Sequence, residues 1–190
     1  MICRGKTIRI IRAAGILFLL MLMSVMIASA AGERATFKTG SQVRADWTAL
    51  AGSRSNVTAI RQYKGSSVPE GVETRTVSAS DSETPIISWF QDGVIYYWSE
   101  DPHPYTNKDA SMMFNGFTQA ATIDVSPFDT SRTEDMEGMF ANCNSVKKLD
   151  VSGFDTSKVK CMYCMFIYDS ALEELDVSHF NTSNATSLSD

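Results

Sequence analysis

The side chains that could carry metal or redox chemistry are few in this sequence. Cys161 and Cys164 have the Cys-x-x-Cys spacing typical of redox pairs and zinc sites, and Cys143 lies upstream. A structural zinc ion takes four ligands, yet no second cysteine pair and no neighbouring histidine pair accompany these residues. We therefore expect no metal site and no cofactor, and interpret the pair as a local disulfide or as two free thiols.

Hydrolase chemistry has equally little to build on. Asp176, Ser178 and His179 supply the residue types of a catalytic triad, but the aspartate and the serine belong to a repeated motif. His103 lies in an Asp-Pro-His-Pro segment without an evident partner, and no nucleophile-elbow motif occurs. We expect that the protein is not an enzyme and keep a secreted hydrolase only as the last alternative.

One short motif occurs three times with a 26-residue period. It occupies residues 123–131, 149–157 and 175–183, and Met-Phe pairs at 113–114, 139–140 and 165–166 keep the same spacing. Self-similarity at such a period is typical of solenoids, in which stacked units form the core together. The sequence thus predicts a β-rich α/β solenoid, similar to a leucine-rich repeat, over residues 109–190 with about three repeats.

Alternation within the motif assigns two faces to each predicted strand. Leu149 and Val151 are apolar and should point inward, whereas the polar residues between them should point outward. The candidate binding face comprises Thr122, Asp124, Ser126, Lys148, Asp150, Ser152, Glu174, Asp176 and Ser178. Its three aspartates would form a column of like charge, about 4.8 Å apart. Either hydroxyl groups and turn amides of the same repeat hold these carboxylates, or a cation or basic partner does.

The segment after each strand carries a second pattern. Met162, Met165 and Phe166 recur at helical spacing, which predicts a short α- or 3₁₀-helical segment on the outer side. Because the Met-Phe pair recurs in every repeat, we expect these residues to be core rather than part of a cofactor site.

Residues 31–108 are predicted to form a small α+β cap. A helix over 41–50 should end at Gly52, and strands are expected over 56–63 and 72–77. Asp92-Gly93 between two aromatic runs predicts a hairpin of 86–90 and 94–98, which should cover the first repeat. Its aromatic residues are interpreted as cap core, with a carbohydrate-binding platform as the alternative: Trp89, Phe90, Tyr96, Tyr97 and Trp98.

The first thirty residues have the pattern of a secretory signal peptide. Four basic residues precede an apolar run, and Ala28-Ser29-Ala30 suits signal peptidase; an uncleaved anchor over 13–31 is the alternative and the only expected membrane contact. Removal of residues 1–30 changes the net charge from −5 to −9, because 13 basic residues then face 22 acidic ones. This balance argues against nucleic acid as a partner.

The repeat unit resembles the BspA-like leucine-rich repeat surface-protein family, on the strength of Leu-Asp-Val-Ser-Gly-Phe-Asp-Thr-Ser followed by Met-x-x-Met-Phe. The resemblance implies an exported bacterial protein, secreted or at the cell surface, that acts as a protein-binding or adhesion module without catalytic residues. It also implies as partners a host or neighbouring-cell surface protein or the extracellular matrix. Phenylalanine occupies the position at which ordinary leucine-rich repeats have a ladder of asparagines, at Phe128, Phe154 and Phe180. A structural stalk, or a fragment of a longer array truncated at its C-terminus, is the alternative.

Overall fold

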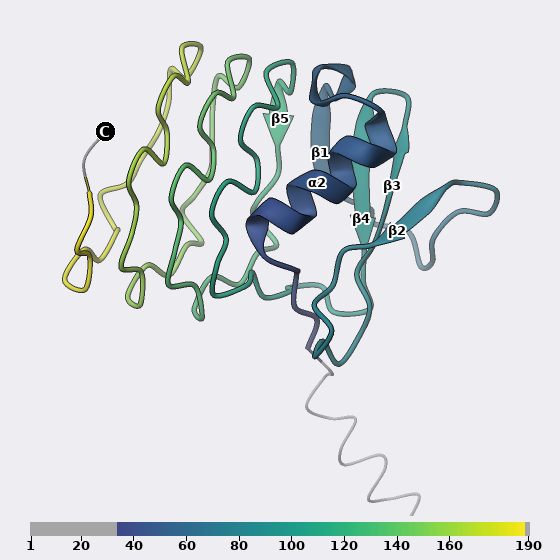
Figure 1. The fold of residues 1–190 in the computed structure, drawn as a ribbon, viewed down its shortest axis with the longest axis horizontal. Helices are drawn as coiled ribbons and strands as arrows, with labels where there is room; N and C mark the ends of the chain where they lie inside the picture. Colours follow the sequence, from purple (N-terminus) through teal and green to yellow (C-terminus); the bar gives the residue numbers. More distant parts are fainter. Residues whose placement is uncertain (1–33, 189–190) are drawn as a thin grey trace, which may run out of the picture. The chain divides into compact units, whose positions relative to one another are not determined.

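The computed structural model describes residues 34–188, which lie within one compact unit (Figure 1). Its regular elements are one α-helix, one 3₁₀ helix and five strands: α2 (Gly40–Ala51), η1 (Arg54–Asn56), β1 (Ala59–Gln62), β2 (Thr74–Thr76), β3 (Ile87–Gln91), β4 (Val94–Trp98) and β5 (Thr122–Ile123). In this part of the chain no helix has the length and apolarity needed to cross a bilayer. The predicted signal peptide and its anchor alternative lie outside the described residues.

The five strands form one mixed sheet that is neither closed nor curled, in the order β2-β3-β4-β1-β5. The predicted hairpin is confirmed: β3 and β4 pair antiparallel around Asp92 and Gly93, whose φ angles of 52° and 81° suit a tight two-residue turn. The expectation that this hairpin covers the first repeat was wrong. Strand β1 lies between them, because it pairs in parallel with β4 on one side and with β5 on the other.

Helix α2, whose existence the sequence predicted, covers one face of this sheet (Figure 1). Val43 and Trp47, on the inner side of the helix, are fully buried. The indole Nε1–H of Trp47 donates to the Ser88 hydroxyl group at 2.9 Å. The helix ends where expected, at Gly52, which has a left-handed φ of 72°. It begins one residue earlier than the predicted range, at Gly40, with Thr39 as its N-cap.

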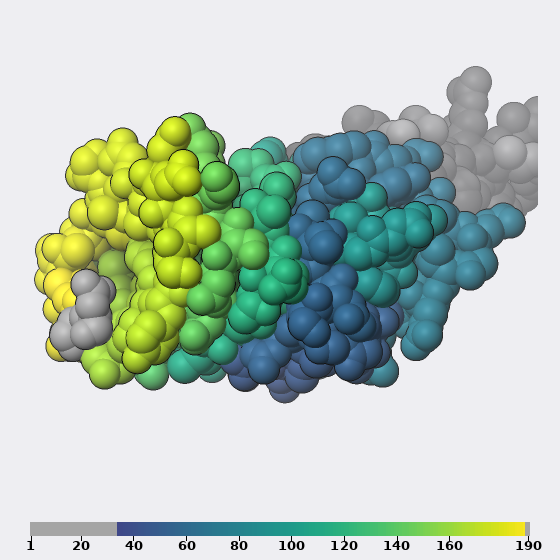
Figure 2. All heavy atoms as spheres, turned by 90° about the horizontal axis from the view of Figure 1, so that it is seen from above, coloured from purple at the N-terminus to yellow at the C-terminus, as the bar shows by residue number. Residues whose placement is uncertain are grey.

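Three repeat units, which begin at Asp109, Asp135 and Cys161, follow the sheet. They lie side by side, as the successive colour bands from teal to yellow show (Figure 2). Parallel bridges join equivalent positions: Asp109 to Asp135, Asp135 to Cys161, Cys161 to Ser187, and Lys148 to Glu174. The prediction of one strand per repeat was only partly right. The first unit has β5 at Thr122–Ile123, but among residues 34–188 the predicted strand position of the later units has only the isolated bridge from Lys148 to Glu174.

The predicted helical segment around Met162 is not helical, and its hydrogen bonds explain why. Alternate N–H groups leave the segment and donate to carbonyls of the next unit: Met112 to Glu137, Phe114 to Met139, Gly138 to Tyr163, and Phe140 to Met165. The N–H groups between them close short turns within the unit, such as Met139 to Met136. A backbone that pairs every second N–H group with its neighbour cannot also form the i→i−4 ladder of a helix.

Two positions of each unit have left-handed backbone angles. The first is occupied by Met112, Gly138 and Cys164, and the second by Gly116, Asn142 and Tyr168. Glycine and asparagine tolerate this conformation, whereas other L-residues lose roughly 1–2 kcal/mol each. The third unit places the less tolerant residue type at both positions, so its turn segment is the more strained.

One continuous core runs from the cap through the units. The predicted Met-Phe core is confirmed: Met113, Met139 and Met165 are at most 3% exposed. Phe140 stacks between Phe114 and Phe166, with ring centroids 5.2 and 5.7 Å away and nearly parallel planes. Each ring therefore covers the next, and burial of the column depends on neighbouring units.

Buried threonines make a second column that links the units through the backbone. Thr130, which is 1% exposed, accepts a hydrogen bond from the Asp155 N–H at 2.8 Å and donates to the Asp155 carbonyl at 3.1 Å. Thr156 makes the same pair of bonds with Asn181. A hydroxyl group that both donates and accepts thus satisfies two backbone groups in the next unit.

Candidate functional site

The predicted binding face lies in columns across the units. Leu149 and Val151 are at most 4% exposed, which confirms the inward side, while Lys148, Asp150 and Ser152 between them are exposed. The corresponding residues Thr122, Ser126, Glu174, Asp176 and Ser178 are exposed, and Asp124 is half-buried. A shallow hollow lined by Lys148, Asp150, Ser152, Glu174 and Asp176 marks this face between the second and third units.

The aspartates of this face have local hydrogen-bond partners. Asp150 accepts from the Ser152 hydroxyl at 2.6 Å and from its N–H at 3.0 Å, and Asp124 has the same partners in Ser126. Asp176 accepts from the Ser178 N–H at 2.9 Å. Hydrogen bonds from Ser152 lower the pKa of Asp150, so its carboxylate is ionised at neutral pH. The first of the two expected arrangements is present with both the hydroxyl group and the turn amide in the first two units, and with the turn amide alone in the third.

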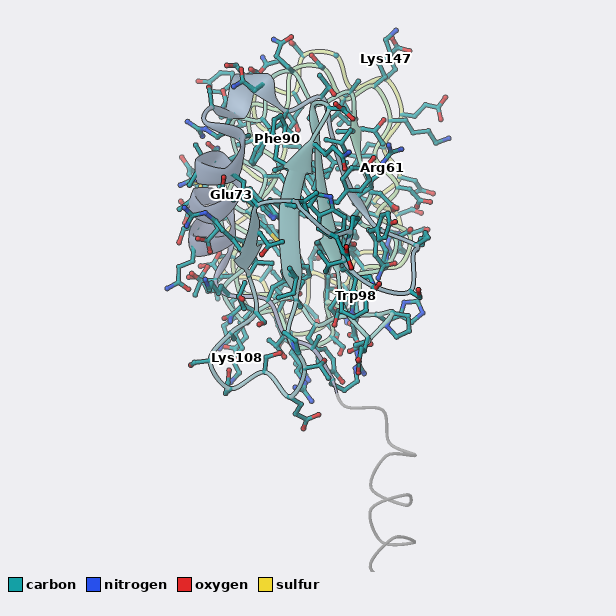
Figure 3. All side chains as sticks on the ribbon, turned by 90° about the vertical axis from the view of Figure 1, so that its right-hand side faces the viewer. Arg61, Glu73, Phe90, Trp98, Lys108 and Lys147 are labelled. Atoms are coloured by element: carbon teal, nitrogen blue, oxygen red, sulfur yellow. The ribbon has the colours of Figure 1, made fainter. Side chains whose placement is uncertain are left out.

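Ion pairs between neighbouring units cross the same face. Lys148 contacts Glu174, and Lys147 contacts Glu173 at 3.3 Å. All four side chains are about two-thirds exposed or more, so these pairs contribute little to stability. Figure 3 shows Lys147, Arg61 and Trp98 on the side of the molecule away from α2. The polar columns therefore continue the outer face of the cap sheet.

The cap aromatics are mainly packed against one another or against the chain. Trp89 is fully buried and stacks on Tyr96 with centroids 5.5 Å apart, while Tyr97 is buried on the opposite, core side of the sheet. Trp98 is partly exposed and donates its Nε1–H to the Gly65 carbonyl at 3.0 Å. These contacts agree with the interpretation as cap core.

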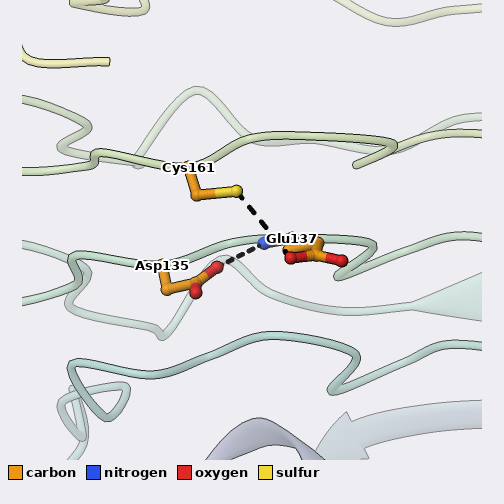
Figure 4. Close-up of side chains that lie close together, drawn as sticks. All are labelled: Asp135, Glu137 and Cys161. Atoms are coloured by element: carbon orange, nitrogen blue, oxygen red, sulfur yellow. Dashed lines mark hydrogen bonds between the residues drawn. The ribbon is translucent and has the colours of Figure 1, made fainter. Parts of the chain in front are cut away.

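The cysteines are free in the described part of the chain, with Cys143 buried and Cys161 and Cys164 half-exposed. Cys161 lies beside Asp135 and Glu137 of the preceding unit, and these three side chains form the one group of potential metal ligands among residues 34–188 (Figure 4). Asp135 already accepts from the Glu137 N–H at 2.8 Å, and the Cys161 thiol is 3.9 Å from the Glu137 carboxylate. The absence of a metal site stays a prediction.

The histidines do not stand in a triad geometry. The Nε2 atom of His179 lies 3.0 Å from the Val151 carbonyl oxygen, and the exposed His103 has no side-chain hydrogen bond among residues 34–188. Ser178 and Asp176 bond to each other through the Ser178 N–H, as in a turn. A general base adjacent to a serine hydroxyl is therefore not formed by these residues.

Three residues of the third unit stand out in the structure, although the sequence analysis did not select them. Tyr163 and Tyr168 are 41% and 69% exposed, among the few large hydrophobic residues at the surface. Asp169 occupies the position of the buried Phe117 and Cys143 and accepts the Cys143 N–H at 2.7 Å. Their departure from the residue types at the equivalent positions of the earlier units was the available signal.

Asp169 makes stability depend on pH. Partial burial raises the pKa of its carboxyl group to about 7, well above the usual value for aspartate, and only the hydrogen bond from Cys143 opposes this. The folded protein then binds more protons than the unfolded chain between about pH 4 and 7, so this group's stabilising contribution is lost as pH rises through 7. We expect the change in stability from pH 4.5 to pH 7.5, measured by urea unfolding, to be more favourable in Asp169→Asn than in the wild type, because the variant lacks this loss.

The comparison of the two proteins isolates this group, because the aspartates with lowered pKa values and the opposite pH dependence are present in both. Asparagine keeps an acceptor oxygen for the Cys143 N–H. An unchanged difference in urea midpoint between the two pH values would contradict the assignment.

The fold and this face define a repeat protein with a cap, a shared core and an exposed polar face. Residues 108–190 match a family model described as "Mycoplasma protein of unknown function, DUF285". No curated protein and no solved structure matches the chain. The match covers the repeat units and not the cap.

Proposed function

We propose that this chain is an exported, surface-associated protein that acts as a protein-binding or adhesion module. We further propose that residues 109–190 are a solenoid similar to a leucine-rich repeat, of the BspA-like kind, with a host or neighbouring-cell surface protein or the extracellular matrix as partner. The family matched by residues 108–190 is generally one of surface-protein repeats, which supports this assignment.

A contrast between buried and exposed positions carries the proposal. The inward residues are nearly constant between units, as in Ile123, Leu149 and Leu175, because they form the core. The adjacent outward position changes from Thr122 to Lys148 to Glu174, whereas the aspartate and serine columns of the face are the same in all three units. Stacked units that share a core present their exposed side chains, both constant and variable, as one extended binding surface, which is how repeat proteins generally recognise partners.

The test is binding of the purified exported chain to intact cells and to wells coated with extracellular-matrix proteins. Asp150→Asn removes one charge from the polar face while leaving an acceptor for Ser152, and we expect at least a fivefold loss of binding. Asp155→Asn is the matched control, since Asp155 is also exposed and also accepts from the N–H of a nearby serine, Ser157, but lies outside the face.

Both variants should have the same urea midpoint as the wild type within error, because asparagine keeps the acceptor oxygen that each turn uses. Equal losses in both variants would mean that net charge, not this face, determines binding. A wild-type chain that binds neither cells nor matrix would contradict the adhesion function and favour the stalk, whose spacing role does not depend on surface side chains.

A further inference from the structure

The turn segment of the third unit presents an aromatic surface that the other units lack. Tyr163 stands where the earlier units have Glu137 and Ser111. Tyr168 stands where they have Asn142 and Gly116. Both tyrosines belong to the segment that bonds to its neighbour unit, on a different part of the unit from the polar binding face.

Folding does not account for Tyr168 at its position. Its φ angle of 62° is in the left-handed region, which glycine and asparagine adopt easily and tyrosine does not. With 69% of its surface exposed, the side chain regains little of that cost through packing. Backbone strain that persists without a packing benefit is typical of functional sites.

The surroundings of Tyr163 are acidic. The Gly138 N–H donates to the Tyr163 carbonyl at 2.9 Å, so the chain at Glu137 adjoins that of Tyr163. Neither Glu137 nor Asp135 forms an ion pair within residues 34–188, and the Glu137 carboxylate has only the Cys161 thiol at 3.9 Å. Two exposed tyrosine rings and half-exposed, unpaired carboxylates therefore lie on adjoining turns.

We propose that Tyr163, Tyr168 and Glu137 form a docking surface for a basic segment of a partner protein. An arginine or lysine side chain is attracted to the face of an aromatic ring and forms charge-assisted hydrogen bonds with a carboxylate, so this combination suits a cation. The excess of acidic over basic residues, a net charge of −5, attracts the same kind of partner. The inference rests on the proposed binding function but assigns it a second, separate surface.

The experiment measures the affinity of the exported chain for a labelled peptide of alternating arginine and glycine, by fluorescence anisotropy at physiological salt. Tyr168→Gly should raise the thermal unfolding midpoint, because glycine relieves the backbone, and yet weaken peptide binding at least fivefold. A residue with a purely structural role would not show these opposite effects. Tyr163→Phe should keep most of the affinity, whereas Tyr163→Ala and Glu137→Gln should each lose at least threefold.

Asp155→Asn is the control for unspecific attraction, because it removes one exposed negative charge that lies outside the polar binding face and outside the docking surface. Peptide affinity that is unchanged in Tyr168→Gly, or that falls as much in Asp155→Asn, would overturn the proposal. The wild-type chain separates the two inferences: binding to cells or matrix without peptide binding refutes only this docking surface. A wild-type chain that binds neither the peptide nor cells or matrix refutes both the docking surface and the proposed function.

Discussion

Phe140→Ala should lower the free energy of unfolding by about 3–5 kcal/mol, the usual range for truncation of a buried aromatic side chain. Phe140 is 1% exposed and stacks on Phe114 and Phe166 in both neighbouring units. Its removal therefore leaves a cavity between three units, and also uncovers one face of each flanking ring. Urea unfolding followed by circular dichroism measures the loss.

Phe166→Ala provides the comparison, because Phe166 is only partly buried and has one stacking partner among the described residues. We expect this variant to lose less than half as much stability as Phe140→Ala. A loss below about 1 kcal/mol for Phe140→Ala would show that the phenylalanine column is not core.

Thr130→Val should cost about 1–3 kcal/mol, although valine has nearly the same shape. The hydroxyl group of Thr130 both accepts from the Asp155 N–H and donates to its carbonyl, at a position that is 1% exposed. Valine would leave both backbone groups without this partner where water has little access. The loss is again read from urea unfolding.

The matched control is Thr182→Val, at the equivalent position of a later unit. Thr182 is exposed and makes no side-chain hydrogen bond within residues 34–188, so the substitution should change stability by less than about 0.5 kcal/mol. If the two variants lost the same amount, the effect would come from the valine itself and not from the bridge between units.

Features encoded by short patterns could be predicted from the sequence. Asp92-Gly93 predicted the hairpin because few residue pairs adopt two consecutive left-handed angles, and the 26-residue period predicted which residues are equivalent. The inward positions of Leu149 and Val151 followed from alternation alone. All three depend on local geometry or on exact repetition.

The expected helix around Met162 could not be excluded from the sequence, since methionine and phenylalanine at helical spacing are equally compatible with a stack of turns. The left-handed backbone positions that break the helix could not be predicted, because Met112, Cys164 and Tyr168 are residue types that rarely adopt this conformation. The strand β1 inserted between hairpin and repeats depends on pairing between distant segments. Of the candidate site, the outward positions were predictable. The hydrogen bonds of Thr130 between units and the exposure of Tyr168 could not be predicted, because both depend on how neighbouring units pack.

The hydrogen bonds between neighbouring units have a consequence for how such a chain evolves. Each N–H group, stacked ring and bridging hydroxyl meets its counterpart only if the loop around the unit has a fixed length. Recombination that adds or removes one whole unit joins equivalent positions and preserves every column. A smaller insertion or deletion instead shifts all later columns out of alignment. Natural variation in length should therefore proceed in whole repeat units, while single-residue insertions are restricted to the exposed bends.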